Sequence, residues 1–356
     1  MHGLKTTGYK AGLNALYWSG VHKLFAPHAR GAGAILMFHR VRPAGGSRFQ
    51  PNAHLEVTPG FLQRVVERAR EHGLDIVDLD EAKRRLLEPE RERRFVVLTF
   101  DDGYRDNFTE AYPILRTLGA PFTVYVATGL IDRTAVPWWE TVVALIERTA
   151  RLRLRIGGQD FDLPTGSLSE RRAAARILVR ELCRVDEDTQ RTAVDLAAAA
   201  NGVDTQRMLA QDMMSWDDVR ALASDPLVTI GAHTVGHYAL ARLRLERARC
   251  EMDASRDRIE AMIGVRPRHF AYPYGSALTA GEREYDLAAE LGFATAVTTR
   301  RGVLGSKSRL TALPRISMNG HYQSTRYVDL LLSGVPIALE RQIRGWVGKG
   351  PSSSAR

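Results

Sequence analysis

The stretch RFVVLTFDDG, residues 94–103, combines a buried strand with an acidic turn. Arg94 to Phe100 is the short apolar run expected of a strand covered on both faces. Successive side chains of a strand point to opposite faces, so Asp101 and Asp102 can serve one site only if the strand ends before them. Gly103 makes that turn easy. We therefore expect two carboxylates at a strand end, although an Asp-Asp-Gly sequence is also common in solvated turns.

This strand belongs to an alternating series of strands and helices. The further apolar runs that predict strands are Ala34 to Phe38, Phe122 to Val126, Val228 to Gly231, Phe270 to Tyr272 and Ala294 to Thr298. Helix-like segments separate most of them, and the predicted helix starts are Thr58-Pro59 (with a helix through Arg70), Ser167 with Glu170, Ser215 with Asp218, and Thr279 with Glu282. The alternation predicts an α/β fold with a parallel sheet or barrel.

Residues 134–212 break the alternation. They contain the pair Trp138-Trp139, a strand-like patch from Leu152 to Phe161 and an Ala/Arg-rich helical stretch. A chain of 356 residues is long enough for one large α/β domain with insertions. We interpret residues 134–212 as an insertion in a single domain that spans residues 34–335.

The two ends of the chain differ from this domain. Residues 1–33 are expected to form an amphipathic arm, because apolar side chains between residues 4 and 25 recur at roughly helical spacing. Such a helix either packs on the main domain, which is the favoured interpretation, or makes peripheral contact with a membrane surface. Residues 336–356 are expected to be a C-terminal tail, frayed from Gly348 onward.

Composition narrows the class of protein. With 44% hydrophobic residues the chain is an ordinary globular protein, which excludes disordered, collagen-like and coiled-coil chains. Two cysteines, Cys183 and Cys250, are too few for a disulfide framework or a thiolate zinc site. No apolar run is long enough to span a membrane, and the N-terminus lacks the apolar core of a signal peptide. We expect a cytoplasmic protein, with membrane association as an alternative.

The positive net charge raises the question of nucleic acid. Lys and Arg number 50 against 41 Asp and Glu, giving a formal charge of +9. The basic residues are scattered, and the densest run, Lys83 to Arg94, alternates with glutamates. No recognition motif accompanies the charge, so no nucleic-acid partner is expected.

A second polar group follows the predicted strand Val228 to Gly231. In His233-Thr234-Val235-Gly236-His237 the two histidines are four residues apart. Residues at this spacing share one face of a helix, where two imidazoles can converge on one ion, although the spacing also suits a plain helix surface. Two imidazoles and one carboxylate form a three-ligand zinc-type site whose open fourth position holds a water. A second carboxylate that is not a ligand can accept the proton of that water.

A third strand end lies at Phe270-Ala271-Tyr272-Pro273-Tyr274-Gly275. A Pro/Gly turn of this kind can present a backbone N–H to an oxyanion, although it is also common as an ordinary tight turn. The carboxyl ends of barrel strands meet at one face, so the three strand ends are expected to lie together.

Thr-Phe-Asp-Asp-Gly at 99–103 and His-Thr-Val-Gly-His at 233–237 resemble the first two motifs of the polysaccharide deacetylase family, the NodB-homology domain of carbohydrate esterase family 4. The resemblance spans roughly residues 34–335. It implies a distorted (β/α) barrel of the NodB-homology type with a helical insertion. It also implies one divalent metal, most often Zn²⁺, bound by Asp102, His233 and His237.

The same resemblance assigns the chemistry. Asp101 is implied as the general base that deprotonates the water, and the backbone N–H of Tyr274 as a donor to the oxyanion. The water attacks an N-acetyl carbonyl, and the products are a free amine and acetate. This is the hydrolysis of a linear amide, a carbohydrate N-deacetylation.

Two departures from the family pattern stand out. Many members carry an arginine in the third motif that orients the base, where this chain has Ala271, and Arg315 is a candidate replacement. Arg315 itself lies in Leu313-Pro314-Arg315-Ile316, where the family's Leu-x-x-His motif supplies the histidine acid. The sequence Met37-Phe38-His39-Arg40-Val41 resembles the early His motif of poly-N-acetylglucosamine deacetylases, so we expect His39 to be the general acid, with His321 as the runner-up.

These residues predict a metal-dependent deacetylase acting on an N-acetylated amino-sugar oligosaccharide, polysaccharide or lipid-linked precursor. Trp138 and Trp139 either stack on sugar faces or, as we favour, anchor the insertion. The alternatives are hydrolysis of another C–N amide, such as deformylation, on the same fold, and a catalytically silent glycan-binding relative. A silent relative has no need of Asp101 beside the metal, which argues for an enzyme.

Overall fold

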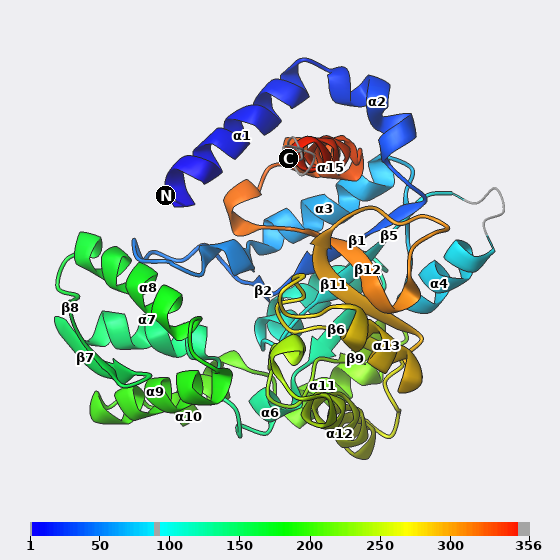
Figure 1. Cartoon of the computed structure of the whole chain (residues 1–356). Coiled ribbons are helices and arrows are strands. Elements are labelled where there is room, and N and C mark those ends of the chain that lie inside the picture. The colour runs from blue at the N-terminus through cyan, green and yellow to red at the C-terminus, as the bar shows by residue number, and fades with distance from the viewer. Residues whose placement is uncertain (1, 89–92, 348–356) are drawn as a thin grey trace, which may run out of the picture.

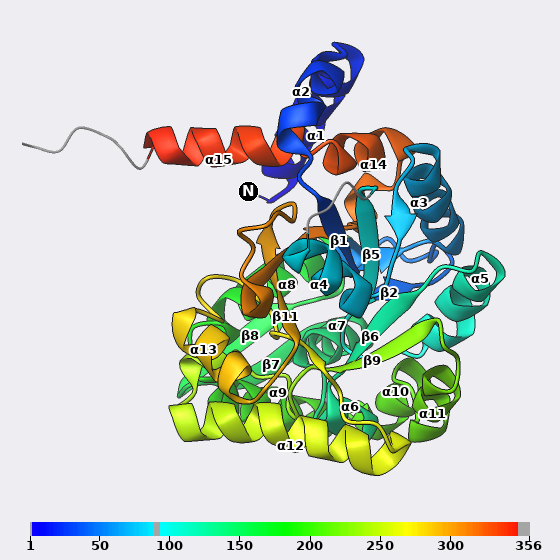
Figure 2. The same cartoon turned by 90° about the vertical axis from the view of Figure 1, so that its right-hand side faces the viewer.

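The computed structural model describes residues 2–88 and 93–347, and it folds around a closed ring of seven parallel strands (Figure 2). In ring order these strands are β1 (Gly33–Phe38), β12 (Leu313–Ser317), β11 (Thr295–Arg301), β10 (His269–Ala271), β9 (Val228–Ala232), β6 (Phe122–Val126) and β5 (Phe95–Phe100), which pairs again with β1. The short β4 (Asp75–Ile76) adds to β5. The expected distorted (β/α) barrel is confirmed.

Strands β1 and β5 end side by side, and the segments that contain His39 and Asp101 begin there. All six residues of each strand are buried, as expected of strands covered on both faces. Their register pairs Gly33 with Phe95 and Phe38 with Phe100, and the N–H of Asp101 donates to the carbonyl of Phe38. The residues that follow the two strands, His39 and Asp101, therefore leave the barrel at the same end.

Helices surround the ring and cover its outer face (Figures 1 and 2). They are α3 (Pro59–Glu71), α4 (Leu79–Leu87), α5 (Tyr112–Thr117), α11 (Trp216–Ala223), α12 (Leu245–Ile263), α13 (Glu282–Glu290) and α14 (Thr325–Leu332). Small elements join them: the pair β2 (Arg40–Val41) and β3 (Glu56–Val57), and the helical turns η1 (Ala53–Leu55), η2 (Asn107–Ala111), η3 (Leu240–Arg242), η4 (Leu310–Ala312) and η5 (Gly320–Tyr322).

Three of the four predicted helix starts are confirmed. Thr58 caps α3 with Pro59 as its first residue, and both Ser167 and Ser215 close capping boxes. The start at Thr279 is wrong, because the Thr279 hydroxyl accepts from the N–H of Ser276 and closes a turn instead. Helix α13 begins after Gly281.

The insertion forms a separate group of elements beside the barrel, coloured green in Figure 1. It contains α7 (Trp138–Arg148), β7 (Arg151–Ile156), β8 (Gln159–Pro164), α8 (Leu168–Leu182), α9 (Glu187–Ala200) and α10 (Thr205–Asp212), and the short helix α6 (Thr128–Ile131) precedes it. The strand-like patch of the sequence is the antiparallel hairpin β7–β8. Leu145, Leu152 and Leu178 bury themselves in an apolar cluster of the insertion's own.

Helices lie near both the N-terminal and the C-terminal ends of the described residues. Helix α1 (His2–Trp18) packs Leu13 against Tyr327 and Leu330 of α14, and α2 (Val21–Ala29) packs on α15 (Val335–Val347). Much of the segment expected to be a tail, residues 336–356, therefore belongs to α15, and Gly348–Arg356 lie outside the described residues. None of the helices in residues 2–88 and 93–347 has the length and apolar character needed to cross a membrane.

Candidate active site

The acidic turn follows β5 as the sequence predicts. Asp102 and Gly103 both have positive φ values, 77° and 83°, so the backbone turns sharply as soon as the strand ends. This turn lets two consecutive carboxylates enter one site although they would point to opposite faces of a strand. Asp101 and Asp102 are only 2% and 3% exposed.

His233 and His237 also converge, but by a different backbone from the one predicted. The expectation that they share a helical face is wrong, since residues 233–237 form an irregular loop after β9. Thr234 and His237 have φ values of 66° and 57°, and the Thr234 hydroxyl accepts from the N–H of His237. The loop curls back, and the two imidazole centroids lie 4.9 Å apart.

Asp102, His233 and His237 form a cluster that fits a divalent cation. Asp102 Oδ1 lies 3.3 Å from His233 Nε2 and 3.2 Å from His237 Nε2. His233 Nδ1 is 2.7 Å from the carbonyl oxygen of Ala271, which can only accept, so Nδ1 carries a hydrogen and, in the neutral ring, Nε2 is left with the lone pair that a metal ligand needs. Buried Asp102 Oδ1 has no hydrogen-bond partner in the described part of the chain. Acceptors that face each other in this way need a cation between them.

The pKa shifts of Asp102 and His237 agree with a cation-binding role for the cluster. Burial alone would raise the pKa of Asp102, but the two imidazoles hold that pKa well below its ordinary value, so the carboxylate is charged. Burial lowers the pKa of His237 even though Asp102 opposes the shift. A charged carboxylate beside an imidazole whose charged form is disfavoured is the combination that metal ligands require.

Asp101 is held by Arg315 from β12. Arg315 Nη1 and Nη2 donate to the two oxygens of Asp101 at 2.7 and 2.6 Å, and Nε donates to the carbonyl of Thr298. The arginine is fully buried. Burial would raise the pKa of Asp101, but the guanidinium keeps it below its ordinary value. Arg315 therefore pairs with Asp101, which is the contact expected of a replacement for the arginine that the third motif lacks at Ala271.

The rings of Tyr274 and Trp139 contact His237, and Trp138 contacts Tyr274. The Tyr274 ring centroid lies 4.8 Å from that of His237, and its hydroxyl accepts a hydrogen bond of 2.9 Å from Trp138 Nε1. The Trp139 ring lies 4.9 Å from His237, and Trp139 Nε1 donates to the Tyr104 hydroxyl. The tryptophan pair therefore anchors the insertion beside the cluster of Asp102, His233 and His237.

The backbone of Tyr274 is also unusual. Its φ is 59°, and its N–H donates no hydrogen bond within the described residues. This backbone donor at a strand end is therefore available for the oxyanion role that the family resemblance implies.

The two candidate acids lie in different places. His39 directly follows β1 and is partly exposed, and the register of β1 with β5 puts it at the same end of the barrel as Asp101. His321 lies on η5 at the surface, where its ring neighbours are His54 and Tyr322. His39 thus follows the strand next to the one that carries the acidic turn, whereas His321 lies on the surface beside η1.

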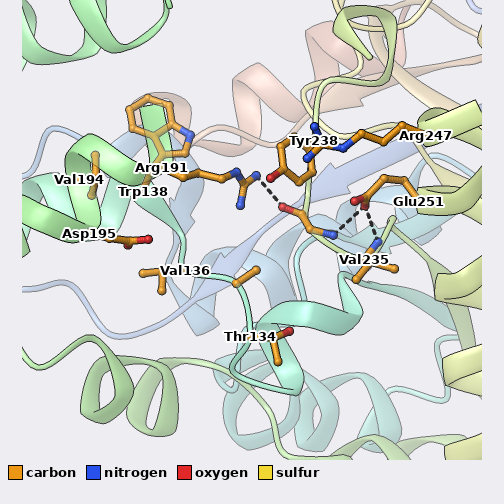
Figure 3. Close-up of a pocket in the computed structure, with 12 residues that line it drawn as sticks. Thr134, Val136, Trp138, Arg191, Val194, Asp195, Val235, Tyr238, Arg247 and Glu251 are labelled. Carbon is orange, nitrogen blue, oxygen red and sulfur yellow. Dashed lines mark hydrogen bonds between the residues drawn. The ribbon is translucent and has the colours of Figure 1, made fainter. Parts of the chain in front are cut away.

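Two residues that the sequence analysis missed hold the histidine loop from behind (Figure 3). Glu251 of α12 accepts from the backbone N–H groups of Val235 and Gly236 at 3.0 and 2.8 Å. Arg191 of α9 donates to the carbonyl of Gly236 at 2.6 Å and to that of His237 at 3.3 Å. Both line a cavity of about 260 Å³ between the insertion and the loop. No local motif marks them, because they reach the loop from distant parts of the chain.

A second missed group is a buried charge cluster behind His39. Arg40 donates to Asp106 at 2.9 Å and to Asp212 at 2.7 Å, and its guanidinium lies over the Tyr104 ring. Burial raises the pKa of nearby Glu140, which lies 3.7 Å from Arg40. This cluster joins β2, the segment after the acidic turn and the insertion around the site.

Comparison with known proteins shows what the chain is similar to. Residues 88–296 match the family model described as Polysaccharide deacetylase. YxkH of Bacillus subtilis (strain 168), which is named as a polysaccharide deacetylase, is 30% identical over 93 residues. That alignment covers 26% of this chain and only 30% of the length of YxkH.

Solved structures show the same fold. The deacetylase PplD of Streptococcus pyogenes, solved in complex with acetate, superposes with a TM-score of 0.54 at 20% identity, covering 81% of this chain and 92% of PplD. IcaB from Ammonifex degensii superposes with a TM-score of 0.53 at 16% identity, covering 84% of this chain and 97% of IcaB.

Proposed function

Because this chain belongs to the polysaccharide deacetylase family, we propose that it is a metal-dependent hydrolase that removes the N-acetyl group from an amino sugar in an oligosaccharide, a polysaccharide or a lipid-linked precursor. The observation that carries the proposal is the pairing of two units at one end of the barrel. One is the cation-binding cluster of Asp102, His233 and His237, and the other is the ion pair between Asp101 and Arg315. Residues 34–335 are the proposed catalytic domain.

The cluster would hold one divalent cation, with zinc favoured because two imidazoles and one carboxylate are typical zinc ligands. Such a cation, when bound, polarises an amide carbonyl and lowers the pKa of water. Asp102 supplies the negative charge, and His233 is oriented by the Ala271 carbonyl. The side chains of this chain then have to position the substrate and move protons.

Asp101 is the proposed general base. It lies beside Asp102, and its carboxylate accepts the proton of the attacking water while Arg315 keeps the group in one orientation. A carboxylate oxygen has two lone pairs, so each Asp101 oxygen can accept from Arg315 and still accept a proton. Arg315 is a positioning residue in this scheme.

His39 is the proposed general acid and the Tyr274 N–H the proposed oxyanion donor. As the carbonyl carbon becomes tetrahedral, its oxygen gains negative charge, which the backbone donor of Tyr274 stabilises. His39 transfers a proton to the nitrogen as the C–N bond breaks, so the amine leaves neutral. The products are the neutral amine and acetic acid, which ionises to acetate in water. Asp101 then loses its proton to solvent and His39 regains one, which restores the enzyme.

The test is acetate release from N-acetylglucosamine oligomers by the protein as purified, after chelation and after zinc is restored. We expect release that disappears on chelation and returns with zinc, and that Asp101→Asn abolishes. Formate release from an N-formylated sugar, with no acetate release, would replace the proposal by deformylation. Glycan binding without release of either acid, unchanged in Asp101→Asn, would identify a silent binding relative.

A further inference from the structure

The net charge of the chain is concentrated at its two ends. Residues 1–32 contain four basic residues and no Asp or Glu, and residues 335–356 contain four basic residues and the single acid Glu340. These two segments therefore account for seven of the nine net positive charges. The domain between them is almost neutral.

The fold brings the two ends together. Helix α2 packs against α15, and the backbone of Ala29 and Arg30 lies close to Gly334, directly before α15. Figure 2 shows both helices extending beyond the barrel on the same side. Within the described residues, the basic side chains of α2 and α15 thus belong to one surface.

That surface is also apolar. The described residues include twelve large apolar side chains that are exposed, and six of them lie on α1, α2 and α15: Trp18, Val21, Leu24, Phe25, Leu339 and Ile343. We call these six residues the terminal helix surface. Trp18 is 74% exposed, Leu24 75% and Phe25 58%. Such a density of exposed apolar side chains is typical of an interaction site, because moving them from water into an apolar environment lowers the free energy.

The terminal helix surface lies at the barrel end opposite the candidate active site. Helix α2 leads into the first residue of β1, and Arg94, directly before β5, donates to the carbonyls of Arg30 and Leu332. The candidate active site begins where β1 and β5 end, six residues later. At roughly 3.3 Å per residue the two ends are about 20 Å apart.

We propose that the terminal helix surface docks on an anionic lipid bilayer. Exposed Trp, Leu and Phe side chains insert at the level of the headgroups, and Lys23, Arg30 and Arg341 meet the negative lipids. A second copy of the chain is a poorer partner, because it would bring the same excess of positive charge to the contact. The docked protein holds its active site away from the bilayer, facing glycan that extends from the membrane.

Vesicle sedimentation of the full chain tests this. We expect it to bind vesicles of phosphatidylcholine with phosphatidylglycerol about tenfold or more tightly than phosphatidylcholine alone, and to dissociate as salt is raised. The double variant Leu24→Ser, Phe25→Ser should lose this binding. Leu278→Ser, which removes an 83% exposed leucine elsewhere, is the matched control and should bind normally.

The charge is tested separately. Lys23→Glu with Arg341→Glu should weaken binding to the anionic vesicles, whereas Arg207→Glu, an exposed arginine on α10, should not. Thermal melts and acetate release from a soluble oligomer should be unchanged in all these variants. Equal binding by both vesicle types, no binding by the wild type, or a dimer that the Leu24→Ser, Phe25→Ser variant dissociates would each overturn the proposal.

Discussion

Arg315 on β12 donates two hydrogen bonds to Asp101, which lies at the end of β5 on the far side of β1. The family pattern places the arginine that orients the base in the third motif, where this chain has Ala271. Here the guanidinium comes from β12, within the segment Leu313–Ile316 where the resemblance expects the acid histidine. The ion pair is therefore retained by a different residue, and the proposed acid moves to His39.

Removing Arg315 should lower the stability of the fold. Arg315→Met leaves the buried carboxylate of Asp101 without its partner, so we expect the free energy of unfolding to fall by about 3–5 kcal/mol. Denaturant melts measure this loss. The double variant Arg315→Met, Asp101→Asn should recover part of it, because no unpaired charge remains. A single variant as stable as the wild type would contradict the role of the ion pair.

Metal binding should depend on Asp102 and not on Asp101. We expect about one zinc ion per chain in the wild type and in Asp101→Asn, and close to none in Asp102→Asn, because only Asp102 faces the two imidazoles. Elemental analysis of the purified proteins measures the content. Loss of zinc from Asp101→Asn would assign that carboxylate to the metal instead.

The residues behind the histidine loop should tune metal affinity. Glu251→Gln and Arg191→Met each remove hydrogen bonds to the loop backbone, so we expect zinc affinity to fall about tenfold or more, as for other residues that orient ligands. Competition with a chromophoric chelator gives the affinity. Asp195 lines the same cavity without bonding to the loop, so the control variant Asp195→Asn should keep the zinc affinity of the wild type. Unchanged affinity in both test variants would show that the loop holds its shape alone.

The two candidate acids can be separated by substitution. His39→Ala should reduce kcat by about 10²–10⁴-fold while zinc content stays normal, because a general acid acts only in the transition state. His321→Ala should leave kcat unchanged, since its neighbours are His54 and Tyr322 on the surface. The opposite pattern would exchange the assignments.

Asp329 should stabilise the fold in a pH-dependent way. Burial would raise its pKa, but His72 and Arg68 lower that pKa to about 2. A carboxyl with a depressed pKa in the folded state stabilises at pH values above its ordinary pKa, and this contribution is lost as the pH falls toward 2. We expect Asp329→Asn to lower the free energy of unfolding by about 1–2 kcal/mol near neutral pH. Below about pH 4 the difference should shrink.

Melts of both proteins across this pH range measure the effect. Asp162→Asn is the matched control, because Asp162 also pairs with arginines but lies exposed on the β7–β8 hairpin. It should leave the midpoint unchanged. A difference between Asp329→Asn and wild type that is as large at pH 3 as at neutral pH would show that lost packing, and not charge, is responsible.

The sequence predicts the barrel well where strands are continuous apolar runs. β5 and β6 lie within one residue of their predicted bounds, because strands covered on both faces need apolar residues throughout. Strand β12 is not predicted, since Pro314 and Arg315 interrupt its apolar pattern. Its polar residues are accommodated only because Arg315 has a buried partner in Asp101.

The candidate site shows the same division. The residue types at strand ends identify Asp101, Asp102, His233 and His237, but the helix inferred from the histidine spacing is wrong. Left-handed backbone at Thr234 depends on tertiary contacts that no local pattern reveals. Contacts between distant segments, such as that of Arg191 with the histidine loop, likewise carry no local signal.

The left-handed backbone around the cluster has a consequence for ligand binding. Asp102, Thr234, His237 and Tyr274 all have positive φ, a conformation that costs a non-glycine residue about 1–2 kcal/mol. The rest of the barrel must stabilise these residues during folding, before any cation or sugar arrives. The site is in this sense preorganised. The conformational entropy of its loops is lost when the chain folds, so metal and substrate binding does not have to offset that loss.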